Sequence, residues 1–338
     1  MSVLAITGSI LAHRQACTPI LRFTDEPLVD LVTRLAVDGT LLVADSYNTP
    51  LLAARGIRPI EIDDSKAETI AAIGAADDIA LVVAVGGCTA LDVGRAIAAE
   101  QGVSVISVPT ILSNSCISSP TSVIEVDGRL ISHKTTGPRE TVISMPTIIA
   151  NHADPLKNWS ASGLGDLLST CGAAAEQAWL AGHLNAAQFS LPAQCRSALD
   201  WVEAVPYPLD EQGLGELAQR LHDFSIDGHE KVPAASEHQL YYTLRARFSH
   251  QRMVATHGKI VGFASLLALL AWVETTGDDT PFNLLRACYQ RIGVPISFAE
   301  LGQIGIPEAD FRLGVSLTCT RLMNHVKDPA WPGWEQLV

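Results

Sequence analysis

The sequence predicts an α/β fold: a dinucleotide-binding, Rossmann-like domain over residues 1–150, followed by an all-α domain over residues 151–338. In the first half, short apolar runs alternate with amphipathic stretches, which is typical of parallel strands joined by helices. Strand-like patterns fade after about residue 150, and helical ones continue to the end. A length of 338 residues also suits two domains better than one.

The elements of the first half follow one another in regular order. We expect a first strand within residues 1–10, because this apolar stretch is too short and lacks the basic leader of a signal peptide. Helices are then expected at 24–35, 49–55 and 66–74, and strands at 40–44, 60–62, 79–85 and 103–108. A β-hairpin is expected at 119–132 with Asp127-Gly128 as its turn, followed by a last strand at 141–150.

Helical patterns dominate the second half. We expect helices at 163–182, 186–205, 211–224, 236–252, 257–274, 281–291 and 308–325. The most apolar run, residues 260–273, is shorter than a membrane span and is therefore expected to be a buried helix.

The composition limits the classes of function. Hydrophobic residues make up 48% of the chain and charged residues 17%, as in a compact globular protein. A formal net charge of −13, without a basic run, argues against a nucleic-acid partner. The seven cysteines include no Cys-x-x-Cys pair, so we expect reduced thiols, a cytoplasmic location and no membrane partner.

The stretch Ile79–Asp92 joins an apolar strand, two glycines and a helix start. Gly86 and Gly87 allow a tight turn and a close approach of ligand to backbone. Thr89, with Asp92 three residues later, matches a capping-box pattern. A helix N-terminus behind such a turn attracts anions. Because the spacing is not G-x-G-x-x-G, the pattern also fits an ordinary strand-to-helix turn.

Other polar residues also follow expected strands. Asp45 and Thr110 each come after a buried apolar run, as the glycine pair does. Since ligands of parallel sheets bind at the carboxyl ends of strands, these positions are candidates for cofactor contacts.

Asp166, His238 and His257 are candidate ligands of a divalent metal. Asp166 follows a Gly-Leu-Gly run in what we expect to be a helix's first turn, and each histidine begins an expected helix. One carboxylate and two imidazoles leave coordination positions open for substrate. Three alternatives remain: Asp166 could stabilise a helix N-terminus, the histidines could be ordinary surface residues, and His250 is a rival ligand.

A metal held in this way would polarise a carbonyl or lower the pKa of an alcohol, so that a hydride could pass to or from a nicotinamide. We then expect the sheet of the first half to bind the cofactor, the helices of the second half to bind the metal, and the substrate to lie in the cleft between the two halves.

In order and spacing, these motifs resemble those of the dehydroquinate-synthase-like and iron-containing alcohol dehydrogenase superfamily, and most nearly those of the glycerol-1-phosphate dehydrogenases. The resemblance spans about residues 40–270. It rests on Gly-Gly-Cys-Thr after a strand, Val-Pro-Thr-Ile-Leu-Ser at 108–113, Ser-Pro at 119–120, Ser-Gly-Leu-Gly-Asp at 162–166, Ser-Glu-His at 236–238 and His-Gly at 257–258.

The resemblance implies a role for each matching residue. The cofactor pyrophosphate would lie against Gly86, Gly87, Cys88 and Thr89, and the nicotinamide side against Thr110, Ser113 and Ser119. Asp45 would take a ribose hydroxyl, which favours NAD over NADP because a 2′-phosphate would meet a like charge. Asp166, His238 and His257 match the family's metal ligands, for zinc, iron or nickel alike. A homodimer through the edge strand of the sheet is also implied.

The chain departs from the family pattern at four positions. Ser115 stands in place of a substrate-binding Asp, and Tyr242 in place of a His four residues after the first metal His. Cys88 replaces a Gly of the turn, and Lys259 replaces a Glu. The first two changes remove groups that bind substrate or move protons. Tyr242 is a candidate proton relay and Ser115 a candidate hydrogen-bond partner, and we group both with Asp166 as candidate catalytic residues.

The sequence therefore favours an oxidoreductase: an NAD(P)-dependent, metal-dependent dehydrogenase. It would interconvert a small polyol or polyol phosphate, such as glycerol 1-phosphate, and its ketone or aldehyde. One alternative is a synthase or lyase like dehydroquinate synthase with catalytic NAD, although no dense set of Lys and Arg adjoins the metal motifs. The other is a catalytically silent, nucleotide-binding paralogue, which the missing Asp and His would fit.

Overall fold

The computed structural model describes residues 18–338 apart from 77, 155–156, 183–190, 229–234 and 248–256. The strand expected within residues 1–10 lies outside these described residues. Two compact units make up the chain. The first contains the residues up to Asp154 together with Leu214–Ile226, and the second contains Pro155–Gly213 and Asp227–Val338.

Residues 214–226 belong to the first unit, although they follow part of the second unit in the sequence. The sequence pattern does not reveal this and predicts that all of 151–338 form one helical domain. Polar contacts hold this segment in place. The Nδ1 atom of His222 lies 2.7 Å from the Ser118 hydroxyl, and the Ser225 hydroxyl donates to the carbonyl of Ser115.

A six-stranded parallel sheet forms the centre of the first unit. Its order is β1-β8-β5-β4-β2-β3, and every neighbouring pair is parallel, so the predicted Rossmann-like α/β architecture is confirmed. The strands are β1 (Ile20–Thr24), β2 (Thr40–Asp45), β3 (Ile60–Ile62), β4 (Leu81–Gly86), β5 (Ser104–Pro109) and β8 (Glu140–Ser144). Its edges are β1 and β3, and the homodimer through an edge strand stays a prediction.

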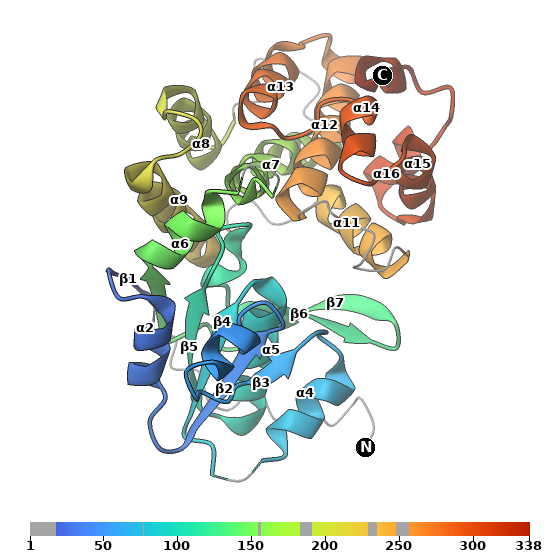
Figure 1. Ribbon diagram of the computed structural model, residues 1–338. Helices are drawn as coiled ribbons and strands as arrows, with labels where there is room; N and C mark the ends of the chain where they lie inside the picture. The colour runs from blue at the N-terminus through green and yellow to red at the C-terminus, as the bar shows by residue number, and fades with distance from the viewer. Residues whose placement is uncertain (1–17, 77, 155–156, 183–190, 229–234, 248–256) are drawn as a thin grey trace. The chain divides into compact units, whose positions relative to one another are not determined.

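Helices connect the strands, as the alternating pattern predicted (Figure 1). They are α2 (Leu28–Leu35), α3 (Thr49–Ala53), α4 (Ala67–Gly74) and α5 (Cys88–Gln101). Alternate residues of the central strands, such as Val83 and Val85 of β4, pack against Leu31 and Val32 of α2 in one apolar core. Because α5 is buried from Ala90 to Ala98, its first turn is held firmly at the end of β4.

A separate antiparallel hairpin of β6 (Thr121–Val126) and β7 (Arg129–Lys134) follows, as predicted. Asp127 and Gly128 form its turn, with φ of 51° and 74°, which matches the type I′ turn that such a sequence favours. The loop between β5 and β6 contains a short 3₁₀ helix, η1 (Ser115–Ile117).

The strand expected at 141–150 is only half correct. β8 ends at Ser144, and α6 (Met145–His152) begins at once. Pro146 explains the change, because proline lacks the N–H that a sheet ladder needs and suits the first turn of a helix.

The second unit is helical, and its described residues include no strand, so the predicted all-α half is confirmed. Its elements are α7 (Trp159–Leu180), α8 (Ala193–Ala204), α11 (Ser236–Arg247), α12 (His257–Thr276), α13 (Thr280–Ile292), α14 (Phe298–Gln303), α15 (Glu308–Leu317), α16 (Arg321–Val326) and η3 (Pro332–Leu337), with α9 (Glu211–Asp223) and the π-helical turn η2 (Phe224–Gly228) leading into and out of the returning segment.

Two predictions for this half were wrong. The single helix expected at 308–325 is two helices, because the Thr320 side chain accepts from the N–H of Met323 and starts α16 anew. The short α14 was not predicted at all. The predicted buried helix is α12, the one described helix apolar and long enough to cross a membrane, and 83% of its apolar window is buried inside the protein.

Candidate metal centre and cofactor site

The metal donors are carried by two helices whose backbones touch. A Cβ on Gly165 of α7 would clash with the carbonyl of Gly258 on α12, and a Cβ on Gly258 would clash with the carbonyl of Ser162. Only glycine permits such close packing. Asp166 follows Gly165 and His257 precedes Gly258, so this contact brings a carboxylate and an imidazole together.

The sequence suggested that Asp166 lies in the first turn of a helix, and this prediction was wrong. α7 begins at Trp159, where the Asn158 side chain caps it by accepting from the N–H of Ala161 at 3.3 Å. Asp166 therefore sits well inside the helix, and stabilisation of a helix N-terminus does not explain it. The glycines before it serve the contact with α12 instead.

Asp166, His238 and His257 meet within the second unit. The Oδ1 atom of Asp166 lies 2.9 Å from Nε2 of His257 and 3.5 Å from Nε2 of His238. One donor atom from each residue lies within 4.8 Å of the others. Asp166 is 1% exposed, and both histidines are half-buried. One carboxylate oxygen and two imidazole nitrogens at this spacing fit a divalent cation.

The protonation of this cluster follows from its contacts. Burial opposes ionisation of Asp166, but hydrogen bonds with His238 and His257 outweigh it and hold the pKa of that carboxyl well below its usual range. Burial disfavours the charged form of His238 too, yet bonds to Asp166 and Glu237 raise its pKa to about 10. Burial lowers the pKa of His257. The buried Asp166 carboxylate is therefore paired with the protonated His238. A divalent cation could take the place of that proton and balance the same negative charge.

Two neighbours of the cluster were not predicted as functional residues. Oε1 of the buried Glu237 lies 2.8 Å from Nδ1 of His238 and leaves Nε2 facing Asp166. The ring of Tyr241 meets the ring of His257 edge-on at 4.4 Å between centroids. Glu237 adjoins His238 in the Ser-Glu-His motif, and a carboxylate beside a candidate ligand is the signal that could have identified it.

The remaining catalytic candidates belong to different units. Tyr242 lies half-buried on α11 in the second unit, and its ring contacts Tyr241 at 5.8 Å. Ser115 begins η1 in the first unit and is buried. The rival ligand His250 lies outside the described residues.

In the first unit, the glycine turn is held by Asp45. Oδ2 of Asp45 accepts from the N–H of Gly87 at 2.8 Å, while Oδ1 accepts from the backbone and side-chain nitrogens of Asn48 at 2.9 and 2.7 Å. Gly86 has φ of +134°, and a Cβ there would clash with the Asp45 carboxylate. The carboxylate thus fixes the turn between β4 and α5; its contact with a ribose stays a prediction.

The capping box expected at Thr89 and Asp92 is wrong. α5 begins at Cys88, and its N-cap residue is Gly87, which has no side chain with which to cap the helix. Asp92 instead pairs with the buried Arg95. Orphan N–H groups of a first turn are what a phosphate group binds, so the uncapped end supports an anion site at Cys88 and Thr89.

The loop after β5 lies beside this turn. The buried Thr110 hydroxyl accepts from the Asn48 side chain at 3.3 Å, which links it to Asp45. Ser113 Oγ lies 3.7 Å from the sulfur of Cys88. Ser119 has a local role as well, since its hydroxyl accepts from the N–H of Thr121 at the start of β6.

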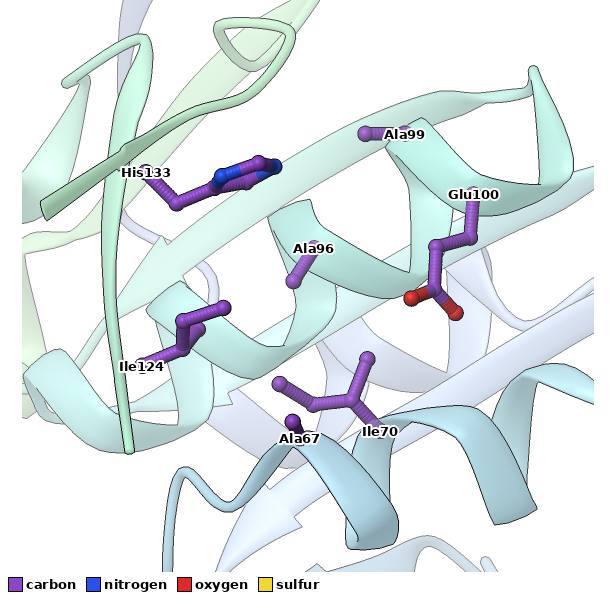
Figure 2. A pocket seen from close by; sticks show the side chains of 7 residues that line it. All are labelled: Ala67, Ile70, Ala96, Ala99, Glu100, Ile124 and His133. Carbon is purple, nitrogen blue, oxygen red and sulfur yellow. The ribbon is translucent and has the colours of Figure 1, made fainter. Parts of the chain in front are cut away.

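A small pocket elsewhere in the first unit is unrelated to these residues. Figure 2 shows it between α4, α5 and the hairpin, lined by Ala67, Ile70, Ala96, Ala99, Glu100, Ile124 and His133. No predicted site residue lies in its wall. The lining is mainly apolar, so it offers little for binding a polar cofactor.

Comparison with known proteins gives a family-model match and several relatives. Residues 28–151 match the family model of the iron-containing alcohol dehydrogenases. A glycerol-1-phosphate dehydrogenase [NAD(P)+] of Bacillus licheniformis is 24% identical over 297 residues, which cover 78% of this chain and 71% of that protein.

Solved structures share the fold. A probable glycerol dehydrogenase from Sinorhizobium meliloti aligns over 91% of each chain with a TM-score of 0.67 and 19% identity. The glycerol dehydrogenase of Schizosaccharomyces pombe aligns over 96% of this chain and 89% of its own, with a TM-score of 0.61 and 15% identity. The chain is therefore similar to the iron-containing alcohol dehydrogenases over residues 28–151 and to glycerol-1-phosphate dehydrogenases over most of its length, and it shares the fold of the glycerol dehydrogenases.

Proposed function

We propose that this chain is an NAD(P)-dependent, metal-dependent dehydrogenase that interconverts a small polyol or polyol phosphate and its ketone or aldehyde. One observation carries the proposal: donor atoms of Asp166, His238 and His257, from three helices, lie within 4.8 Å of one another. The name of the Bacillus licheniformis relative, which specifies glycerol 1-phosphate and NAD(P)+, supports the substrate class and the cofactor.

The three donors would hold zinc, iron or nickel, since a carboxylate and two imidazoles suit all of them. Bound there, the ion would polarise the substrate's C–O group. Glu237 would keep Nε2 of His238 directed at the ion by accepting a hydrogen bond from Nδ1–H. The buried surroundings of Asp166 would keep competing water out.

The first unit would bind the nucleotide. The turn at Gly86 and Gly87 and the uncapped start of α5 would take the pyrophosphate. Thr110, Ser113 and Ser119 would line the nicotinamide side. The negative charge of Asp45 at this turn favours NAD, because a 2′-phosphate would be repelled.

Two residues of this chain would act on the substrate's hydroxyl groups. Tyr242 follows His238 by four residues, so it shares a face of α11 with that ligand and would relay a proton through its phenol. Ser115 would hydrogen-bond a substrate hydroxyl. Because both replace charged or basic residues of the family pattern, we expect a preference for neutral polyol groups at these two contacts.

The experiment measures metal content and turnover on the same preparation. Purified protein is loaded with zinc, iron or nickel, and NADH formation is followed with glycerol, glycerol phosphates and related alcohols, with and without a chelator. We expect stoichiometric metal, turnover that chelation abolishes and metal restores, and loss of both metal and turnover in Asp166→Asn.

The outcomes separate the rival functions. Product formed with catalytic NAD and no net NADH would favour a synthase or lyase. A protein that holds no stoichiometric metal and binds no NAD by calorimetry would contradict the proposal, and metal-free NAD binding would favour a silent paralogue.

A further inference from the structure

Two cysteines of the first unit are neighbours at the glycine turn. Cys88 is the first residue of α5, and its sulfur lies 3.0 Å from Oδ1 of Asn114. The same oxygen accepts from the N–H of Cys116 at 2.9 Å. Both cysteines therefore contact the same amide oxygen, Cys88 through its sulfur and Cys116 through its backbone N–H. The side chain of Asn114 thus fixes the sulfur of Cys88, on α5, next to the backbone of Cys116, in η1.

The two thiols differ in a way that suits a sequential reaction. A hydrogen bond from Cys116 lowers the pKa of the Cys88 thiol, and Cys88 also lies at the positive end of a 14-residue helix. Burial raises the pKa of the Cys116 thiol. Cys88 would thus attack an electrophile first, and Cys116, still protonated, would react second.

The other described cysteines lack this combination of a neighbouring thiol and exposure. Cys171 and Cys195 lie near each other, but both are buried, as is Cys288. Cys319 is exposed, and its sulfur contacts the carbonyl of Leu317. Cys88 and Cys116 are both partly exposed, so a small oxidant can reach them.

We propose that Cys88 and Cys116 are an oxidative modification site, where a hydroperoxide converts the two thiols into a disulfide that joins the glycine turn to η1. The proposal rests on the contacts of these residues alone. Cys88 is also the residue that replaces a glycine of the family's turn, so the site is a property of this chain.

The chemistry balances in two steps. The Cys88 sulfur attacks one oxygen of the hydroperoxide; an S–O bond forms, the O–O bond breaks, and the alcohol leaves with the thiol's proton. The Cys116 sulfur then attacks the sulfenic acid, an S–S bond forms, the S–O bond breaks, and water leaves with the second proton. Two thiols lose two electrons, and the hydroperoxide gains them.

A consequence follows if the proposed function is correct. Cys88 would contribute a backbone N–H to the pyrophosphate site, so a bond from its sulfur to Cys116 would constrain the turn and weaken NAD binding. Conversely, bound NAD would shield Cys88 from oxidation. A thiol reductant would reverse the disulfide and restore binding.

The experiment treats the full-length protein with hydrogen peroxide and maps the unreduced peptides by mass spectrometry. We expect a Cys88–Cys116 cross-linked peptide that forms before any Cys171–Cys195 link and disappears on reduction. Cys319→Ala, which removes an exposed thiol elsewhere, should leave the link unchanged. Cys116→Ser should accumulate sulfenic and sulfinic acid at Cys88; circular dichroism checks that this variant is folded.

Two results would overturn the proposal: Cys88 in the wild type oxidising to sulfinic acid without a link, or equal oxidation of Cys88 and Cys319 with no cross-linked peptide. NAD titration is a separate arm. Reductant should restore NAD binding of peroxide-treated wild type fully, but that of Cys116→Ser only in the fraction whose Cys88 has stopped at sulfenic acid, because sulfinic acid is not reduced by thiols. If the link forms but the reduced protein binds no NAD, the proposed function is refuted and the disulfide proposal is supported. If the protein binds NAD but no link forms, the disulfide proposal is refuted and the proposed function is unaffected.

Discussion

Single side chains set the orientation of the metal donors. Glu237 carries no donor atom of the candidate site, yet its contact with Nδ1 of His238 decides which imidazole nitrogen faces Asp166. The three candidate donors could be proposed from their motifs. Their shared environment could not, because Asp166 and His257 are 91 residues apart in the sequence, and only folding brings them together.

Replacing Glu237 should weaken metal binding without removing a donor. We expect Glu237→Ala to reduce metal affinity by about 10- to 100-fold, because the imidazole of His238 loses the acceptor that fixes its orientation. Glu237→Gln should lose less, since an amide oxygen still accepts from Nδ1. Competition with a coloured chelator measures the affinity. Glu308→Gln, which disrupts a surface pair with Arg312, should change nothing; an equal loss in both variants would contradict the assignment.

His152 should make the stability of the protein depend on pH. Burial lowers its pKa from 6.5 to about 4, and its Nε2 accepts from the N–H of Leu112 at 3.0 Å. As pH falls below 6.5, the unfolded chain binds a proton that the folded chain excludes, so this contribution to stability is full above pH 6.5 and is lost toward pH 4. The loss amounts to roughly 3 kcal/mol.

Denaturant unfolding at both ends of this pH range tests the effect. His152→Gln keeps an acceptor for Leu112 but cannot be protonated, so its unfolding free energy should fall less than that of the wild type. His133→Gln, at a partly exposed site of the hairpin, should keep the wild-type slope. Identical slopes in wild type and His152→Gln would exclude this role.

At the scale of elements, the contact between α7 and α12 brings two of the candidate metal donors together. The sequence predicted both helices, although it began α7 at 163 and not at Trp159. It could not reveal that they touch through Gly165 and Gly258, because a helical glycine has the same appearance wherever it packs. The error at Thr89 has a similar origin. A local pattern predicted a side-chain cap there, whereas the backbone at Gly87 and the distant Asp45 define the turn.

Adding one methyl group at Gly258 should separate the helices. We expect Gly258→Ala to destabilise the protein by about 3 kcal/mol and to weaken metal binding, because the new Cβ would overlap the carbonyl of Ser162. Gly302→Ala is the matched control, since a Cβ there meets open space within a helix and should be neutral or slightly stabilising. Thermal unfolding and metal affinity are measured together; tolerance of Gly258→Ala in both would refute the contact.

At the scale of the whole molecule, each unit carries its own candidate site. Most of the strand and helix order of both was predictable, because periodicity and glycine turns are local signals. The return of Leu214–Ile226 was not, because an amphipathic helix such as α9 does not encode which core it covers.

Metal removal should lower the thermal stability of the protein. A ligand that binds only the folded state adds about 2.7 kcal/mol when its free concentration is about 100 times Kd. Calorimetry with and without a chelator should therefore show an unfolding transition that shifts downward on metal removal. Asp166→Asn should unfold alike under both conditions. Identical transitions for metal-loaded and chelated wild type would show that no ion is bound in the folded state.

The chain passes between its two units three times, after Asp154, after Gly213 and after Ile226. A proteolytic nick near Asp154 would therefore not yield two self-sufficient pieces. The larger fragment would still contain α9 and η2. Their partners Ser118 and Ser115 would be on the smaller fragment. Nicked protein should elute as a single complex, and neither fragment alone should recover the native structure, so a gene split at this point would work only by complementation.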